Sequence, residues 1–331
     1  MDKYVVVFGV ENFVGWALAK RLARFGYKVV CPIDSKFEGK AFLNYCAANY
    51  IYTVKLDFDK PLAVCKAVKD INPRQIFYFS AYGQRSGDDF SLIKYFQVDL
   101  PKKIIEECLD DDNARFIYQG SSASTNYFNS AHCPYKEAKD LAVKVLLQDS
   151  SQKDKSVCIL RPTHLYGPDM YSSSALIDFC YKAFVESFIF TESIIFNQDF
   201  LHIRDFINLA ILVSGAPQLG SSIINCRSGE VLTGGIALQA VRPFLPNVFL
   251  QDAAGVLSKK PTFNARDTVL LDSDFINWKP VVPLTKGLPE FFEWILGSCI
   301  YLALPGQDAK VISDLRDAYA LKNSCPIERF F

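Results

Sequence analysis

The chain has 331 residues, of which 50% are apolar, 14% aromatic and 22% charged. This composition is typical of a globular protein with a sizeable core, and it excludes a disordered, collagen-like or coiled-coil chain. The 36 basic side chains equal the 36 acidic ones, so the formal net charge is zero and the composition gives no argument for nucleic acid as a partner.

The ten cysteines are scattered through apolar runs such as Val29–Cys31, and none of them forms a Cys-x-x-Cys pair. Zinc therefore lacks its usual signature, no metal site is predicted, and the pattern favours reduced core thiols in a cytoplasmic protein. No segment approaches ~18 consecutive apolar residues, so we expect no membrane span. The first apolar run, Tyr4–Val10, is interrupted by Glu11 and fits a strand better than a signal peptide.

Along the chain, short β-branched or aromatic runs alternate with longer segments in which apolar residues recur at helical spacing. This repetition predicts right-handed crossovers and an α/β fold with a doubly wound, Rossmann-type parallel sheet of about seven strands. The predicted strands are Tyr4–Gly9, Val29–Ile33, Ile51–Leu56, Gln75–Ser80, Arg115–Gln119, Val157–Leu160 and Ile223–Cys226.

The first strand runs into a loop, Phe8-Gly-Val-Glu-Asn-Phe-Val-Gly15, that precedes a predicted helix. A dinucleotide-binding loop uses glycines for a tight turn, for close approach to a pyrophosphate and for helix–strand packing. Gly9 and Gly15 stand at the two ends, and Asn12 takes the middle position, where we expect it to replace glycine at positive φ. An ordinary strand–helix turn with two glycines is the alternative.

Two acidic residues follow the next strands. Asp34 comes 19 residues after Gly15, where a carboxylate can bind the adenosine ribose and repel a 2′-phosphate. This favours NAD as cofactor without excluding NADP. Asp57 follows the third strand, where it can hold the edge of the adenine. A helix N-cap is the alternative for both residues.

A Tyr-x-x-x-Lys pattern joins Tyr135 and Lys139 behind Pro134. On a helix both side chains lie on one face, and a nearby ammonium lowers the pKa of a phenol, which makes Tyr135 a candidate general acid/base for a carbonyl/alcohol pair. Ser122, with Ser121 as the second choice, ends the fifth strand 13 residues before Tyr135 and offers a hydroxyl to the reacting oxygen. A surface Tyr–Lys pair is the alternative.

We divide the chain into a dinucleotide-binding Rossmann domain, a smaller substrate-binding lobe at the strand ends, and a C-terminal extension that the apolar spacing predicts to be helical. The first comprises residues 1–168, with 200–228 returning to it, the second 169–199 and 229–296, and the third 297–331.

These motifs, in this order, resemble the extended short-chain dehydrogenases/reductases, and more precisely the NAD-dependent epimerase/dehydratase family acting on nucleotide sugars. The resemblance covers roughly residues 3–296. It rests on the glycine loop, Asp57, the Ser121-Ser122 strand end, Tyr135-x-x-x-Lys139, Leu160–Pro168, Phe200–Asp205, Ile224–Glu230, Trp278–Pro280 and Gly287-Leu288.

The resemblance implies that Tyr135 is the proton donor and acceptor, that Lys139 holds the nicotinamide ribose, and that Ser122 orients the reacting hydroxyl. It also implies two binding sets. The cofactor set is Gly9, Asn12, Phe13, Gly15, Asp34, Asp57, Ser80, Ala81, Tyr135, Lys139, Pro162 and Thr163. The substrate set is His164, Gln198 and Arg266, for which a structural hydrogen-bonded His164 and a surface ion pair of Arg266 are the alternatives.

The sequence also departs from the family pattern. Phe8, Asn12, His164 and Gln198 stand where the family usually has Thr, Gly, Asn and Arg. Ala123 and Ser124 follow Ser122, where the dehydratases of the family carry an Asp-Glu pair. Since neither residue can protonate a leaving hydroxyl, the sequence favours C4 epimerisation or 4-keto reduction of a nucleotide sugar over 4,6-dehydration.

Two other functions are weighed against this one. A cofactor-binding pseudoenzyme or scaffold without turnover is the main alternative, against which stands the intact Ser–Tyr–Lys set. A reductase of a small carbonyl compound is a weaker third interpretation. We also expect a homodimer built as a four-helix bundle, as in relatives, from two apolar outer faces. These faces would consist of Ile104, Ile105 and Cys108 on one helix and Leu141 and Val145 on another.

Overall fold

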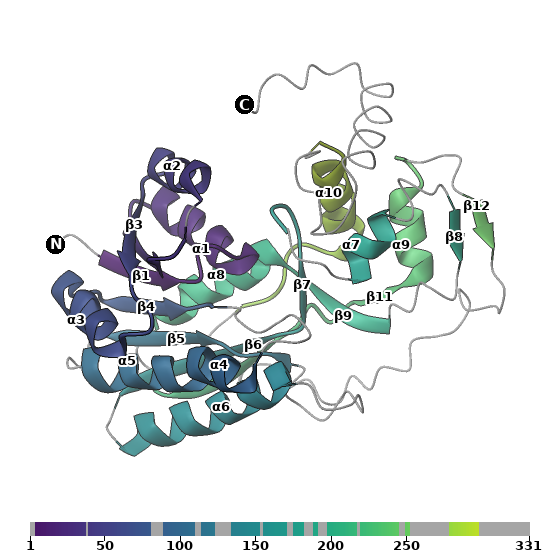
Figure 1. Cartoon of the computed structure of the whole chain (residues 1–331). Helices are drawn as coiled ribbons and strands as arrows, with labels where there is room; N and C mark the ends of the chain where they lie inside the picture. The colour runs from purple at the N-terminus through teal and green to yellow at the C-terminus, as the bar shows by residue number, and fades with distance from the viewer. Residues whose placement is uncertain are drawn as a thin grey trace. The chain divides into compact units, whose positions relative to one another are not determined.

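The computed structural model describes most of the chain (Figure 1), and the chain divides into two compact units. The first comprises Met1–Thr163, Arg204–Arg227 and Thr268–Lys279, and the second His164–Ile203, Ser228–Asp267 and Pro280–Phe331. The described residues are 4–37, 39–80, 89–109, 114–122, 134–152, 155–170, 175–181, 188–190, 197–216, 219–244, 249–251 and 278–297. Residues 298–331, and with them the expected helical extension beyond Gly297, lie outside these ranges.

The first unit is built on a seven-stranded parallel sheet in the order β10-β6-β5-β4-β1-β2-β3. The order reverses next to β1, because the chain moves outward to β3 on one side and returns through β4 on the other. The predicted doubly wound α/β sheet is therefore confirmed. Its strands are β1 (Tyr4–Phe8), β2 (Lys28–Asp34), β3 (Ile51–Leu56), β4 (Gln75–Tyr78), β5 (Arg115–Gln119), β6 (Ser156–Pro162) and β10 (Ser222–Cys226).

The central strands are apolar on both faces because helices cover the sheet on both sides. Val5, Val6 and Val7 of β1 are fully buried, as are Phe116 and Tyr118 of β5. The helices of this unit are α1 (Phe13–Arg24), α2 (Lys40–Ala48), α3 (Pro61–Ile71), α4 (Phe90–Lys94), the π-helical turn η1 (Tyr95–Asp99), α5 (Leu100–Cys108), α6 (Pro134–Gln152) and α8 (Ile203–Ser214).

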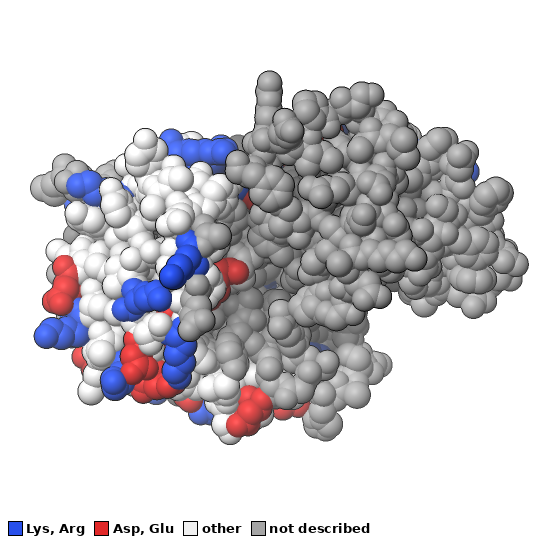
Figure 2. Space-filling view, turned by 45° about the horizontal axis from the view of Figure 1, so that its top comes forward, with Lys and Arg blue, Asp and Glu red and all other residues white. Residues whose placement is uncertain are grey.

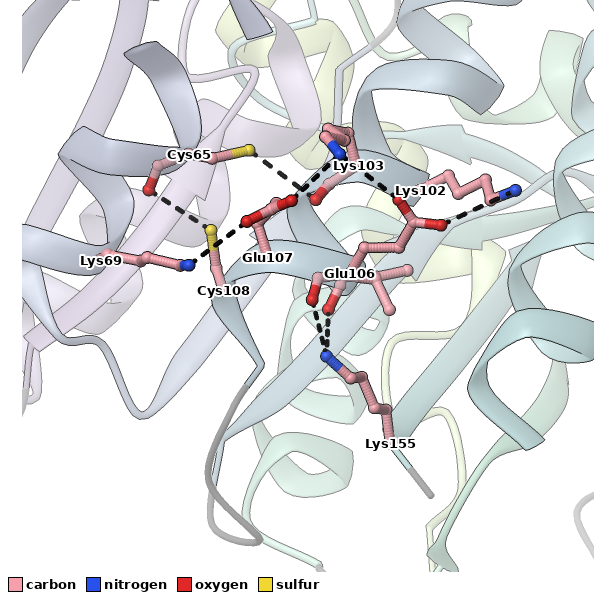
Figure 3. Close-up of polar contacts among 9 residues, drawn as sticks. Cys65, Lys69, Lys102, Lys103, Glu106, Glu107, Cys108 and Lys155 are labelled. Atoms are coloured by element: carbon pink, nitrogen blue, oxygen red, sulfur yellow. Dashed lines mark hydrogen bonds and ion pairs between the residues drawn. The ribbon is translucent and has the colours of Figure 1, made fainter. Parts of the chain in front are cut away.

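The helices α3 and α5 lie side by side and are joined by two thiol hydrogen bonds and by the ion pair of Lys69 with Glu107 at 3.4 Å (Figure 3). The Cys65 thiol donates to the Lys103 carbonyl at 3.7 Å, and the Cys108 thiol donates to the Cys65 carbonyl at 3.4 Å. At the end of α5, the Lys155 ammonium donates to the carbonyls of Ile105 and Glu106, both at 2.9 Å. A cation there satisfies carbonyls that the helix leaves free and complements the helix dipole. The cysteines that the structure describes carry free thiols, and all except Cys108 are buried.

One expectation about α5 is wrong. The sequence predicts that Ile104 and Ile105 lie on an outer face that binds a second copy, but both are fully buried in the core of this single chain. They point at the sheet because α5 itself must cover it. Cys108, Leu141 and Val145 are partly buried against the same core.

The second unit contains two small sheets. One has the order β11-β9-β7, in which β9 (Asn197–His202) runs parallel to β7 (His164–Tyr166) and antiparallel to β11 (Val231–Thr233). The other pairs β8 (Phe188–Phe190) with β12 (Phe249–Gln251) in parallel. Its helices are α7 (Ala175–Tyr181), α9 (Gly234–Val241) and α10 (Leu284–Gly297).

On the face shown in Figure 2, basic and acidic side chains are interspersed over the coloured part of the surface, in line with the zero net charge of the chain. Among the described helices, none has both the length and the apolar composition needed to cross a membrane.

Close packing of α10 generates a stability prediction. A Cβ at Gly287 would overlap the Tyr166 hydroxyl and lie 2.9 Å from Cδ2 of His202, and both of these side chains are fully buried. We expect Gly287→Ala to lower the free energy of unfolding by about 1–3 kcal/mol, because overpacking forces a shift of α10. Urea denaturation followed by circular dichroism measures this. Gly215→Ala is the control, since a Cβ there would meet no atom closer than 3.7 Å, and equal stability losses in both variants would contradict the packing argument.

Candidate active site

The backbone of the loop between β1 and α1 is closely packed around Gly9 and Gly15. Gly9 has a φ of +88°, and a Cβ on it would lie 2.6 Å from both Nδ2 of Asn12 and the Phe79 carbonyl. Gly15 lies directly against the Gly9 carbonyl, so any side chain there would separate α1 from β1. Gly9 therefore permits the tight turn and Gly15 the close packing of α1 on the loop, which are two of the three roles that glycines have in a dinucleotide-binding loop. The loop therefore fits the dinucleotide that the sequence predicts.

The expectation for Asn12 is wrong. Asn12 has an extended backbone, with φ −111° and ψ 164°, and it is the N-cap of α1. Its Oδ1 accepts hydrogen bonds from the backbone N–H groups of Val14 and Gly15, both at 3.0 Å. Its Nδ2 donates to the Phe79 carbonyl at 2.7 Å. Asparagine is favourable here as a cap, which requires an extended conformation, and not as a substitute for glycine at positive φ.

Asp34 and Asp57 lie at the same edge of the sheet, because Asp34 ends β2 and pairs with Leu56 at the end of β3. Neither is a helix N-cap, since Gly39 precedes α2 and Lys60 precedes α3. Asp34 accepts from the backbone N–H of Lys36 at 2.7 Å. The hydrogen bond and ion pair with Lys60 at 2.9 Å, aided by the N–H of Asp59, lower the pKa of Asp57.

Glu11 is a loop residue that the sequence analysis did not assign to the site. Desolvation of its carboxyl group and, to a smaller extent, the like charge of Asp34 raise the pKa of Glu11. The charge of Asp34 at the end of β2 therefore acts on the carboxyl group of a residue in the glycine loop. An acidic residue inside a glycine-rich loop was the signal that could have revealed it.

Lys139 is the most strongly perturbed cation near the predicted catalytic residues. It is 1% exposed, and its ammonium donates to the Gln119 carbonyl at the end of β5 at 2.6 Å. The nitrogen also lies 5.5 Å from the ring centre of Tyr135, one helical turn earlier on α6. Burial lowers the pKa of Lys139 to about 7. The structure thus brings Tyr135 and Lys139 together on one helix face, which excludes the alternative of a surface pair.

The two candidate serines follow the strand that holds Lys139. Gly120 donates to the Leu160 carbonyl at 2.7 Å, and Ser121 and Ser122 are the next residues in the chain. Nε of Arg161 donates to the Ser121 carbonyl at 3.3 Å, which fixes the strand end. The Lys139 ammonium and the two serines therefore all lie at the carboxyl end of β5.

The ring of a buried tyrosine, Tyr118, lies against the Lys139 ammonium. The Lys139 nitrogen lies 4.6 Å from the ring centre of Tyr118, within cation–π distance. The Tyr118 hydroxyl donates to the carbonyl and the side-chain oxygen of Gln97, at 3.0 and 3.2 Å. Gln97 belongs to the π-helical turn η1. Sequence reasoning missed Tyr118, because its only signal in the sequence is an aromatic residue in a predicted strand.

Two further strand ends carry cofactor candidates. The Ser80 carbonyl accepts from Nε2 of Gln97 at 3.5 Å. Pro162 ends β6, and the N–H and hydroxyl of Thr163 both donate to the Cys226 carbonyl, at 3.0 and 3.4 Å. Ala81 lies outside the described residues.

The substrate candidates His164 and Gln198 belong to the second unit, on the adjacent strands β7 and β9. The imidazole of His164 stacks on Phe200 with ring centres 5.2 Å apart. Burial lowers the pKa of His164, while the charge of Asp199 and a hydrogen bond with Gln198 oppose that shift. These two residues are therefore in direct contact, whereas Arg266 lies outside the described residues.

Comparison with known proteins identifies the class. The sequence matches the NAD-dependent epimerase/dehydratase family over residues 5–226. The chain therefore belongs to this family. The predicted family and the predicted cofactor, NAD, are both confirmed by this match.

Solved structures share the fold. Pal from Bacillus thuringiensis is 17% identical, with a TM-score of 0.70 over 88% of this chain and 98% of that one. The UDP-glucose 4-epimerase of Thermotoga maritima is 16% identical, with a TM-score of 0.67 over 88% and 98%. The dTDP-glucose 4,6-dehydratase of Bacillus anthracis, in complex with NAD, is 15% identical, with a TM-score of 0.66 over 88% and 96%. At these identities the similarity shows the fold.

The burial of Lys139 predicts a pH-dependent stability. Its pKa is about 7 in the folded protein and ordinarily 10.5, so between these values the unfolded chain binds more protons and wild-type stability rises with pH. Lys139→Met lacks this contribution. We expect the free energy of unfolding of the variant minus that of wild type to fall by about 1 kcal/mol per pH unit above pH ~7. Urea denaturation of nucleotide-free protein between pH ~6 and ~9 measures it. Lys144→Met, on the exposed face of α6, is the control, and a pH-independent difference for Lys139→Met would contradict the assigned pKa.

Proposed function

We propose that the protein modifies a nucleotide-activated sugar with NAD, by C4 epimerisation or 4-keto reduction, and that Ser122, Tyr135 and Lys139 carry out the proton chemistry. The observation that carries this proposal is the position of the Lys139 ammonium, buried at the end of β5 and 5.5 Å from the Tyr135 ring. A buried cation beside a phenol has a chemical use in proton transfer.

The residues that would hold the cofactor follow the ends of the parallel strands. Gly9, Phe13 and Gly15 would surround the pyrophosphate, Asp34 would bind the adenosine ribose, and Lys139 the nicotinamide ribose. NAD, when bound, supplies the acceptor and donor of hydride. The protein contributes position and proton transfer.

Tyr135 would take the proton from the sugar hydroxyl as that carbon is oxidised, and return it as the carbon is reduced. A protonated Lys139 stabilises the phenolate form of Tyr135 and so assists the first of these steps. With its pKa near 7, Lys139 changes charge close to neutral pH. The hydroxyl of Ser122, or of Ser121, would donate to the reacting oxygen and hold it beside the phenol.

Dehydration is a poorer match for this chain. Elimination of water needs an acid at the leaving hydroxyl, and the residues after Ser122 are Ala123 and Ser124. Structures similar in fold include both 4-epimerases and a 4,6-dehydratase, so the choice depends on these side chains and not on the fold.

The reaction is tested by incubating the purified protein with UDP-glucose and UDP-N-acetylglucosamine and following the sugar by NMR. Conversion to the C4 epimer without added cofactor identifies an epimerase that retains NAD. Oxidation of added NADH with a 4-keto sugar nucleotide identifies a reductase. Bound NAD without turnover of any nucleotide sugar favours the scaffold function instead.

For the catalytic residues, we expect Tyr135→Phe to lower kcat at least ~10²-fold while the affinity for NAD stays nearly unchanged, because only the transferable proton is lost. Lys139→Met should weaken both turnover and NAD binding. Steady-state kinetics and calorimetry separate the two effects.

The control is Tyr50→Phe, at a tyrosine that is 78% exposed. Activity of Tyr135→Phe within a few-fold of wild type would refute the mechanism. Ser121→Ala and Ser122→Ala decide which hydroxyl acts.

For cofactor selection, we expect Asp34→Ala to shift the ratio of NADP to NAD affinity roughly tenfold towards NADP, since a carboxylate repels the 2′-phosphate. Glu11→Gln should act in the same direction but more weakly. Fluorescence titration with NADH and NADPH measures the ratio. Asp70→Ala, on the exposed side of α3, is the matched loss of one charge and should leave the ratio unchanged, and an unchanged ratio in Asp34→Ala would remove Asp34 from the site.

The homodimer and the cytoplasmic location stay predictions. With Ile104 and Ile105 in the core, a second copy would have to bind elsewhere on these helices. Phe90 and Leu92 on α4, each 40% exposed, offer apolar surface there. The helix α4 packs against α6, which carries Leu141 and Val145. We propose this α4–α6 surface in place of the α5 face.

A further inference from the structure

We propose that Asn12 is an internal competitor of the NAD pyrophosphate: its carboxamide occupies backbone donors of α1 that the phosphate oxygens need, and it thereby lowers the affinity for the dinucleotide in exchange for stability of the loop. The proposal rests on the family's cofactor and not on the reaction. It concerns one residue at which this chain departs from the family pattern.

The first step of the argument is a count of donors. A helix leaves its first N–H groups without intrahelical acceptors, and an anion at the N-terminus binds through them. In α1 these groups belong to Phe13, Val14 and Gly15. Oδ1 of Asn12 takes the last two, both at 3.0 Å. Within the part of the chain that the structure describes, the N–H of Phe13 is the one first-turn donor that has no acceptor.

The second step concerns the other end of the same side chain. Nδ2 of Asn12 donates to the Phe79 carbonyl at 2.7 Å, which ties the glycine loop to the residue before Ser80. The absence of a side chain at Gly9 makes room for this bond, because a Cβ there would lie 2.6 Å from Nδ2. The hydrogen bond from Nδ2 of Asn12 to the Phe79 carbonyl therefore links the loop to the residue after β4, independently of the helix cap, and we call this link the strut.

These two roles have opposite consequences for a bound dinucleotide. The strut holds the loop and the β4 end at a fixed separation, which favours binding of a ligand that touches both. The cap withdraws donors, and the phosphate must displace Oδ1 to reach them. Since an N-cap hydrogen bond is a stabilising interaction, its displacement is equivalent to a loss of about 2- to 30-fold in affinity. The loss applies to ligands with a diphosphate and not to a nucleoside.

Two variants separate the cap from the strut. Asn12→Ser and Asn12→Gly both lose the bond to Phe79, but serine remains a good N-cap whereas glycine has no side chain to offer. Calorimetric titration with ADP-ribose and with adenosine gives the affinities, and thermal unfolding gives the stabilities. We expect Asn12→Gly to bind ADP-ribose at least about threefold more tightly than Asn12→Ser. Both should bind adenosine equally, and Asn12→Gly should have the lower Tm.

A stability control is available in the second unit. Oγ1 of Thr233 caps α9 by accepting from the N–H of Ile236 at 3.3 Å. Thr233→Ala should lower the Tm, as any lost cap does, and leave the affinity for ADP-ribose at the wild-type value. ADP-ribose affinity of Asn12→Gly no higher than that of Asn12→Ser would overturn the proposal, as would an equal gain for adenosine.

A measurement on wild-type protein covers the case in which Asn12→Gly does not fold. In protein labelled with ¹⁵N-asparagine, the side-chain amide of Asn12 is the resonance missing from the Asn12→Ser spectrum. Saturation with ADP-ribose should shift it, because Oδ1 leaves the N–H groups of Val14 and Gly15, whereas adenosine should leave it in place. A resonance that does not move with bound ADP-ribose would show that the phosphate binds without displacing Asn12, contrary to the proposal.

Discussion

The parallel pairing of seven strands is the constraint on which the first unit depends. Parallel strands place all their carboxyl ends at one edge, and the strand order reverses beside β1, which is the point of that edge where ligands bind in such sheets. The candidate residues gather there because each one follows a strand: Gly9 after β1, Asp34 at the end of β2, Ser80 after β4 and Ser121 after β5. The parallel sheet therefore brings to one edge residues that are more than a hundred positions apart in the sequence, such as Gly9 and Ser121.

The packing of α6 on the sheet buries Lys139, and this burial changes the pKa of its ammonium group. An ammonium in the core is unfavourable, and the chain compensates with the Gln119 carbonyl and the face of the Tyr118 ring. Tyr118 is held in turn by Gln97 in η1, so the π-helical turn contributes to the position of a cation two elements away. A group kept near its titration point at neutral pH can respond to a neighbouring phenol.

The glycine loop shows a compromise between stability and binding. Gly9 and Gly15 permit the tight turn and the close packing of α1, but glycines lose more conformational entropy on folding than other residues. Asn12 offsets part of this cost by capping α1 and bridging to Phe79. The same hydrogen bonds use donors that an anion would need. Local structure that favours an ordered loop is therefore in conflict with the ligand that the loop receives.

The sequence by itself determined the class of fold, the cofactor and the pairing of Tyr135 with Lys139, because strand periodicity, glycine spacing and the i, i+4 geometry of a helix are local properties. It did not determine the conformation of Asn12, which depends on whether its side chain finds the amides of α1 and the Phe79 carbonyl 67 residues away. The sequence pattern also predicted the wrong neighbour for Ile104 and Ile105. The apolar spacing of a helix is the same whether its own sheet or a second chain covers that face. The pKa of Lys139 and the role of Tyr118 depend on burial among distant strands, which only the tertiary structure decides.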